Sequence, residues 1–163
     1  MGRKQHHCHG SPERFEVVAE FIVETFGNDV QYIADVAGGK GLLSRLLSKH
    51  YNYDTEVIDP RGWRLKGVAG HEKEFDAAMA GYYDLIIGLH PDEATRAIAE
   101  AALIRPAVLI PCCNFWSKEK LGRDELVAAI ADFYQTNGVS YQIVTFKFKG
   151  PKNIGLVSFP PQQ

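Results

Sequence analysis

YIADVAGGKGLLSR, residues 32–45, is the stretch of sequence that decides the fold. It is a short apolar run followed by an acid, a glycine cluster and leucines at helical spacing. An apolar strand that leads into a glycine turn and a helix is how α/β proteins hold adenine-containing ligands. Glycines let the backbone approach a ligand where a Cβ would collide, and the helix N-terminus offers unpaired N–H groups. The stretch therefore predicts a strand, a glycine turn and a helix in which the turn binds a ligand.

The rest of the chain continues the alternation of strands and helices. Apolar runs without alternation, at residues 84–90 and 107–111, are typical of strands buried on both faces of a parallel sheet. Two final segments separated by Gly150-Pro151-Lys152 predict a hairpin. Helices are predicted at about 11–26, 42–47, 91–104 and 123–136, and strands at about 32–36, 55–58, 84–90, 107–111, 141–149 and 153–159. Residues 61–80 are ambiguous, and a short strand at 67–71 with a helix at 75–79 would fit them.

This order predicts an α/β fold, a three-layer Rossmann-like, mainly parallel sheet with a C-terminal antiparallel hairpin. In such sheets ligands bind outside the carboxyl ends of the strands, at the point where the strand order reverses. We expect residues 11–163 to form a single domain, preceded by a flexible tail at residues 1–10.

The composition narrows the class of protein. A net charge of −2 gives no strong field for nucleic acid, and no apolar run is long enough to span a membrane. The three cysteines are an odd number, which argues against a disulfide framework, and the N-terminus lacks the apolar core of a signal peptide. We therefore expect a cytoplasmic protein with no membrane partner.

The motifs resemble those of the class I S-adenosylmethionine-dependent methyltransferases. The family pattern D/E-x-G-x-G-x-G aligns with residues 35–41, where Gly39 and Gly41 match and Ala37 replaces the first glycine. GKGxLS at 39–44, GLH at 88–90 and PCC at 111–113 are similar to a narrower methyltransferase-like group. That group usually continues GLH with an A-C-G-D-type segment, but residues 91–95 differ, so the resemblance does not carry the substrate over.

The resemblance implies S-adenosylmethionine (SAM) as the cofactor. It assigns the cofactor contacts to the glycine turn and to the ends of two strands, with Asp35 ordering the turn; the implied residues are Asp35, Ala37, Gly38, Gly39, Gly41, Asp59 and Leu89. Asp59 follows Asp35 by 24 residues and can accept two hydrogen bonds from a ribose diol. For the glycine stretch, the alternative is a strand-to-helix turn with a purely structural role. For Asp59, the alternative is an aspartate that only forms the turn before Pro60. A nicotinamide dinucleotide is a rival ligand.

The predicted catalytic residue is His90, which ends a strand beside the expected methyl group and could act as a base. Its alternative role is to cap the helix that starts at Pro91. Cys112 and Cys113 could be a nucleophile, metal ligands or pocket wall, and wall residues are the commonest use of free cysteine. Phe115 and Trp116 could clamp a planar substrate, but we expect them to belong to the core or to cover the sheet edge.

Two further groups of residues are expected to have no functional role. The tail residues His6, His7, Cys8 and His9 could bind metal only with partners such as His71, Cys112 or Cys113, so we predict no metal site. A basic, aromatic loop follows Asp59 and is expected to be solvated rather than to contact adenine or an anionic substrate; it contains Arg61, Trp63, Arg64 and Lys66.

The sequence as a whole predicts a SAM-binding methyltransferase. The acceptor, whether RNA, protein or a small molecule, and the oligomeric state are not indicated. One alternative is a catalytically inactive cofactor-binding module within a larger complex, and a second is a nicotinamide-dinucleotide-binding protein.

Overall fold

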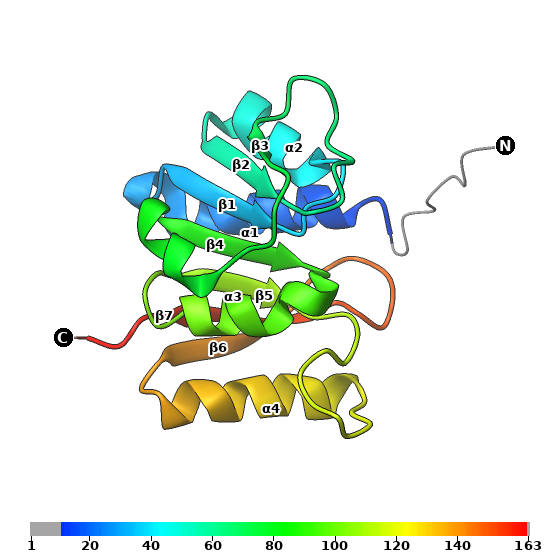
Figure 1. Cartoon of the computed structure of the whole chain (residues 1–163), viewed down its shortest axis with the longest axis vertical. Helices are drawn as coiled ribbons and strands as arrows, with labels where there is room; N and C mark the ends of the chain where they lie inside the picture. The colour runs from blue at the N-terminus through cyan, green and yellow to red at the C-terminus, as the bar shows by residue number, and fades with distance from the viewer. Residues whose placement is uncertain (1–10, 163) are drawn as a thin grey trace, which may run out of the picture.

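A seven-stranded sheet forms the centre of the protein, in the order β3-β2-β1-β4-β5-β7-β6 (Figure 1). The computed structural model describes residues 11–162. β7 runs antiparallel to both of its neighbours, and the other paired strands are parallel. The strands are β1 (Tyr32–Val36), β2 (Asp54–Ile58), β3 (Gly70–His71), β4 (Leu85–Leu89), β5 (Ala107–Ile110), β6 (Ser140–Thr145) and β7 (Ile154–Phe159). The predicted fold class is confirmed.

Helices cover both faces of this sheet. α1 and α2 pack on one apolar core, and η2, α3 and α4 pack on the other. The α-helices are α1 (Arg14–Phe26), α2 (Leu42–Tyr51), α3 (Thr95–Ala101) and α4 (Arg123–Thr136), and the 3-10 helices are η1 (Gly27–Asp29), η2 (Ala77–Tyr82) and η3 (Asp92–Ala94). The chain is therefore a three-layer sandwich, as Figure 1 shows.

The central strands have unbroken apolar sequences because both of their faces are covered. In β4, Leu85 and Ile87 enter the core under α1 and α2, whereas Ile86 enters the core on the opposite face. Because both faces are covered, polar residues have no solvated side to occupy. The strand order reverses between β1 and β4, which pair directly. A ligand crevice is therefore expected at the carboxyl ends of these two strands.

The C-terminal hairpin has a wider loop than the sequence predicts. β6 ends at Thr145, and residues 146–153 form the connection, so the tight turn expected at 150–152 is wrong. Phe146 and Phe148 are buried in the core beneath α1 instead of continuing the strand. The amide of Phe146 donates to the carbonyl of Asn153 at 2.7 Å and closes the loop. Burial of two aromatic rings therefore outweighs continued strand pairing.

Two predicted helices start later than expected. The segment predicted as a helix at 75–79 is the 3-10 helix η2, which begins after Asp76; the side chain of Asp76 accepts a hydrogen bond from the amide of Ala78. The helix predicted from residue 91 becomes α-helical only at Thr95, because Asp92 has a positive φ of 50°. This interruption leaves Asp92 at the carboxyl end of the sheet, just after β4.

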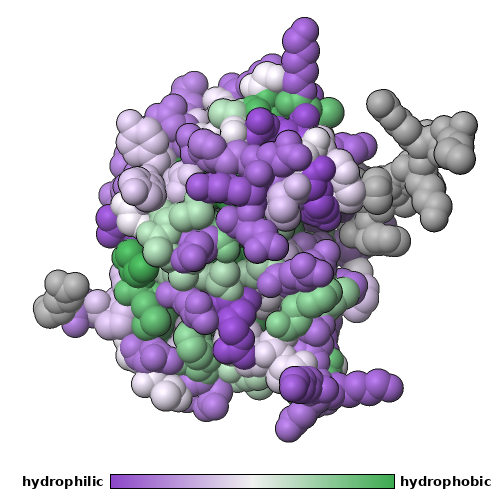
Figure 2. Space-filling model, viewed as in Figure 1, coloured by the Kyte–Doolittle hydropathy of each residue, from purple (hydrophilic) through white to green (hydrophobic). Residues whose placement is uncertain are grey.

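The surface in Figure 2 is mostly hydrophilic, with apolar residues gathered beside the C-terminal end of α3. Leu103 and Ile104, which follow α3, are 36% and 40% exposed. Among residues 11–162, none of the helices combines the length and the apolar character needed to cross a bilayer.

Candidate functional site

The glycine turn follows β1 and precedes α2. Ala37, Gly39 and Gly41 have φ angles of 55°, 59° and 82°, in the left-handed region that disfavours a Cβ. The position where Ala37 replaces the family glycine therefore adopts the conformation for which glycine is suited. The turn is closed by a 2.9 Å hydrogen bond from the Gly41 amide to the Gly38 carbonyl.

Asp35 lies beneath this turn and is 2% exposed. The hydroxyl of Ser44 in α2 donates to Asp35 Oδ2 at 2.9 Å. A Cβ at Gly38 would stand 2.6 Å from the Asp35 carboxyl carbon, so only glycine fits above the carboxylate. Burial raises the pKa of Asp35 to about 6, although the Ser44 hydrogen bonds oppose the shift. Asp35 thus changes charge close to neutral pH.

Asp59, directly after β2, is the second buried carboxylate at this edge. The Gly39 amide donates to Asp59 Oδ2 at 2.9 Å, so the acid and the glycine turn are in contact. The Arg61 amide donates to Asp59 Oδ1 at 2.9 Å, and the Arg61 guanidinium reaches Oδ2 at 2.6 Å. Burial alone would raise the pKa of Asp59, but the hydrogen bonds from Arg61 and Gly39 hold it below its usual value.

The loop after Asp59 lies over the glycine turn. Arg61 Nη2 also donates to the Ala37 carbonyl at 3.3 Å, and the guanidinium carbon lies 4.4 Å from the centre of the Trp63 ring. The amide of Leu65 donates to the carbonyl of Lys40 at 2.9 Å. The expectation of a merely solvated loop therefore needs correction at Arg61, because buried Asp59 binds its guanidinium.

His90 follows β4 with a φ of 52°. Its Nε2 lies 2.7 Å from the carbonyl of Lys152, which can only accept, so Nε2 carries the proton and Nδ1 is the free base of the neutral ring. Burial lowers the pKa of His90, which favours the neutral ring at pH 7. The alternative that His90 caps the next helix is wrong, since neither η3 nor α3 has a side-chain cap.

The two cysteines follow β5 at the same edge of the sheet. The Cys112 thiol donates to Asp92 Oδ1 at 2.7 Å, and the Nζ of Lys152 lies 3.6 Å from Cys113 Sγ. Burial, followed by the Asp92 carboxylate, raises the pKa of Cys112 to about 12. Cys112 is half-buried and Cys113 is exposed.

The aromatic residues beyond the cysteines differ in their surroundings. Trp116 packs edge-on against Phe133 of α4, and the guanidinium of Arg96 lies 3.9 Å from the Trp116 ring centre. Phe115 is 44% exposed. Trp116 is therefore a covering residue that joins α3 to α4, and Phe115 is available at the surface.

Other candidate ligands lie elsewhere. His71 in β3 is 3.2 Å from Glu56 Oε2, away from the cysteines that follow β5. His6, His7, Cys8 and His9 lie outside the described residues.

Sequence reasoning missed four residues of this edge. Ser44 and Arg61 lie near the acids they contact, nine and two residues away, so helix and turn geometry could have found them. Asp92 and Lys152 contact their partners from 20 to 62 residues away, and no local pattern signals such pairs.

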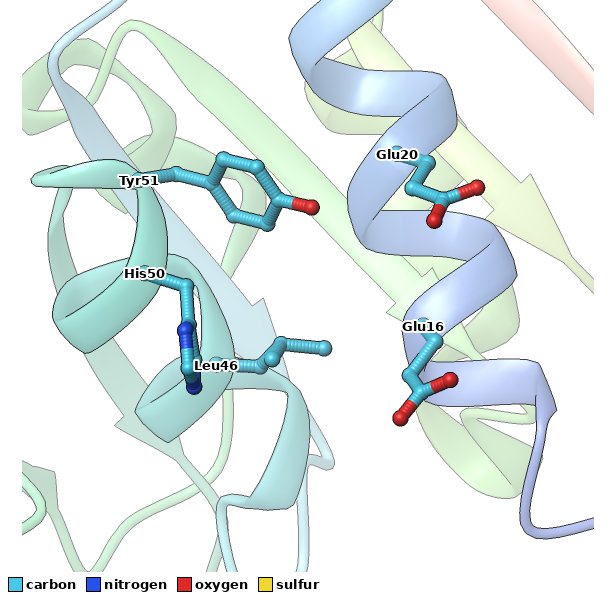
Figure 3. Close-up of a pocket in the computed structure, with 5 residues that line it drawn as sticks. All are labelled: Glu16, Glu20, Leu46, His50 and Tyr51. Carbon is cyan, nitrogen blue, oxygen red and sulfur yellow. The ribbon is translucent and has the colours of Figure 1, made fainter.

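A separate hollow of about 350 Å³ lies between α1 and α2 (Figure 3). In Figure 3, Glu16 and Glu20 on α1 face Leu46, His50 and Tyr51 on α2. None of these residues belongs to the strand ends, so this hollow is distinct from the edge that carries the glycine turn.

Comparisons with known proteins identify the class of fold. No protein-family model matches the sequence, and no curated protein sequence matches it. The structure is similar to magnesium protoporphyrin IX methyltransferase (ChlM) from Synechocystis PCC 6803 with bound SAM: the TM-score is 0.65 and the identity 16%, over 91% of this chain and 78% of that one.

Two further solved structures are similar. For a human methyltransferase 10 domain containing protein the TM-score is 0.66 at 9% identity, over 94% of this chain and 83% of that one. For the sugar N-methyltransferase KedS8 from Streptoalloteichus sp ATCC 53650 it is 0.59 at 14% identity, over 99% and 98%. These similarities establish a methyltransferase-type Rossmann-like fold. The narrower group with GKGxLS, GLH and PCC motifs stays a prediction.

Proposed function

We propose that this protein binds SAM at the carboxyl ends of β1 and β2 and transfers its methyl group to an acceptor. One observation carries the proposal: buried Asp59 accepts a hydrogen bond from Gly39 in the turn after β1, in a sheet of methyltransferase type. An acid and a glycine turn in contact at a strand-order reversal form a site for a ribose and its attached chain.

The residues present fit such a ligand. Asp59 would accept hydrogen bonds from the ribose diol, and the backbone of the turn would hold the amino-acid end. Among residues 11–162, apart from its neighbours in the chain, a Cβ placed on Gly39 would have only Arg61 Nη2 within 4 Å, at 3.8 Å. The backbone of Gly39 is therefore open on this side apart from one flexible side chain, which a ligand can move.

Arg61 must give up Asp59 for the ribose to bind there. The guanidinium is 39% exposed and can turn toward solvent while remaining near the Trp63 ring. The exchange replaces an ion pair between guanidinium and carboxylate with hydrogen bonds from uncharged hydroxyls, so it opposes binding. We therefore expect Arg61 to lower the affinity for the cofactor by competing for Asp59, rather than to raise it by binding the cofactor.

His90 is the proposed general base. When bound, SAM supplies an electrophilic methyl group, so the protein must align the acceptor and remove its proton where one is lost. The hydrogen bond from Nε2 to Lys152 fixes the ring and leaves Nδ1 free to take that proton. Leu89, at the end of β4, is proposed to contact the cofactor.

Calorimetry with the full chain tests the ligand. We expect SAM and S-adenosylhomocysteine to bind with one site per chain, and NAD to bind weakly or not at all. Failure of both sulfur ligands would contradict the proposal, and tight binding of NAD would support the nicotinamide alternative.

A transfer assay tests the reaction. The protein is incubated with SAM carrying a labelled methyl group and with pooled RNA, protein or metabolites. Labelled product that is lost in His90→Gln, with SAM affinity retained, supports the proposal. SAM binding without transfer to any pool would instead support the inactive cofactor-binding module.

A further inference from the structure

Three potential metal ligands meet at the carboxyl ends of β4 and β5. Asp92 comes from the turn after β4, and Cys112 and Cys113 come from the segment after β5. One ligand atom from each lies within 4.8 Å of the other two. No step of the proposed methyl transfer uses these three side chains, so their convergence needs its own explanation.

We propose that Asp92, Cys112 and Cys113 bind a divalent cation of the zinc type. The inference is independent of the SAM site, because it uses none of the residues assigned to the cofactor. It revises the expectation from the sequence that the cysteines are pocket wall and that the chain holds no metal.

The distances suit such an ion. Zinc bonds of about 2.3 Å to sulfur and 2.0–2.2 Å to carboxylate oxygen place tetrahedral ligands roughly 3.5–3.8 Å apart. The three ligand atoms already lie within 4.8 Å of one another, and Cys112 Sγ is 2.7 Å from Asp92 Oδ1. Small rotations of side chains, without movement of strands, would bring all three to a shared ion.

The donor set selects the metal class. Two soft thiolates together with one carboxylate suit zinc, which binds both sulfur and carboxylate oxygen, whereas magnesium and calcium require oxygen ligands. The Lys152 ammonium lies 3.6 Å from Cys113 Sγ, so a cation already lies beside this sulfur. A bound metal ion would take its place, and Lys152 would turn to solvent. Because Cys113 is exposed, a water molecule could complete the coordination.

The backbone holds Asp92 in this position. Asp92 and His90 both have positive φ angles, 50° and 52°, which are uncommon for residues other than glycine. The hydroxyl of Thr95 donates to the Asp92 carbonyl at 2.7 Å and stabilises the turn. Such conformations cluster at functional sites, where the surrounding structure enforces them. Here the conformation delays α3 and brings the Asp92 carboxylate to Cys112.

The experiment must separate this site from the N-terminal tail. The background is the full chain with His6→Ala, His7→Ala, Cys8→Ala and His9→Ala, because these four side chains could bind zinc themselves. Zinc affinity is measured by competition with a chromophoric chelator. Cobalt then replaces zinc, and its thiolate charge-transfer absorption reports sulfur ligation. We expect one zinc ion per chain and a cobalt spectrum with thiolate bands.

Substitutions in this background assign the ligands. Cys112→Ser, Cys113→Ser and Asp92→Asn should each weaken zinc binding by more than about tenfold. Lys152→Gln should strengthen it, because the competing ammonium is removed. His71→Ala, which removes a histidine paired with Glu56 on the far edge of the sheet, should leave it unchanged.

The proposal is overturned if the background variant binds no zinc at micromolar concentration, or if each of the three ligand variants binds zinc as tightly as the background does. Thermal unfolding of each variant checks that the fold is intact. If the cysteine variants do not fold, Asp92→Asn and the cobalt spectrum decide, since a spectrum without thiolate bands would exclude sulfur ligation.

Discussion

The two halves of the sheet edge that carry the candidate sites differ in how their charges are compensated. At β1 and β2, Asp59 is fully paired: Gly39 and Arg61 occupy both carboxylate oxygens. At β4 and β5, Asp92 meets a thiol, and Lys152 meets the exposed sulfur of Cys113. A ligand must therefore displace a guanidinium from a buried carboxylate at the first half, whereas at the second half an ion displaces the Lys152 ammonium and a thiol proton from side chains that are already close together.

This difference predicts how substitutions in each half should change the affinity for its ligand. At β1 and β2 a ligand competes with groups of the protein itself, so substitutions alter affinity in both directions. At β4 and β5 removal of any one ligand should only weaken binding. The four predictions that follow test the first half, from the largest expected effect to the smallest.

Asp59→Asn should cause the largest loss of cofactor affinity. The neutral amide keeps the shape of the side chain but removes the charge that two ribose hydroxyls would bind. Loss of two charge-assisted hydrogen bonds is worth about 3 kcal/mol, or roughly a hundredfold in Kd. Calorimetry with SAM measures the effect.

The matched control is Asp84→Asn at the opposite ends of the strands. The carboxylate of Asp84 accepts hydrogen bonds from the amides of Gln31 and Tyr32, both at 2.8 Å. This substitution should lower stability without changing SAM affinity. Equal affinity losses in the two variants would remove Asp59 from the ribose-binding role.

Asp35 should make stability depend on pH. Its pKa is about 6 in the folded chain against an ordinary value of 3.8. Between these pH values the unfolded chain loses the proton first, so the free energy of unfolding falls as pH rises. At about 1.4 kcal/mol per pKa unit, this contribution falls by about 2–3 kcal/mol from pH 4 to pH 7.

Asp35→Asn has no such titration. Denaturant unfolding of both proteins at several pH values isolates the contribution, since all other groups are shared. The stability of the variant relative to the wild type should rise through this pH range. A constant difference would show that the pKa of Asp35 is not raised.

Arg61→Gln should strengthen SAM binding about fivefold, or by about 1 kcal/mol, because the ligand no longer displaces a charged partner from Asp59. Arg64→Gln, on the same exposed loop, is the control and should leave the Kd unchanged. Weaker binding in Arg61→Gln would show that Arg61 contributes directly to the ligand site.

Ala37→Gly should have the smallest effect. Release of a left-handed alanine gains about 1–2 kcal/mol, and the added freedom of the unfolded chain takes back roughly 0.4–1 kcal/mol. We expect a net stabilisation of about 0.5–1 kcal/mol in thermal unfolding. Asn52→Gly at the end of α2, where φ is 59°, should gain less because asparagine tolerates this region better. A destabilised Ala37→Gly would mean that the methyl group packs usefully.

The fold and the first half of the edge could be predicted because their determinants are local. β1, the glycine turn and the acid after β2 each occupy a few consecutive residues, and helical or strand spacing places them. The long hairpin loop was missed because Phe146 and Phe148 are buried by tertiary packing, which their strand-like sequence does not reveal.

The second half of the edge could be predicted only in part. Because His90, Cys112 and Cys113 follow apolar strands, the sequence predicts that they lie at the carboxyl ends of the sheet. It does not predict their partners. Lys152 contacts His90 across 62 residues through the hairpin, and the position of Asp92 depends on a positive φ within a segment expected to be helical. Such contacts exist only once the strand order is known.

The position of β7 has a consequence for synthesis of the chain. β7 is made after β6 but lies between β5 and β6, so residues 107–110 have no partner on that side until residues 154–159 leave the ribosome. All four residues of β5 are fully apolar and buried in the finished protein. During translation they form an open apolar edge, which is a template for pairing with another chain. A delay between the exit of residues 107–110 from the ribosome and the exit of residues 154–159 should therefore favour aggregation of the nascent protein.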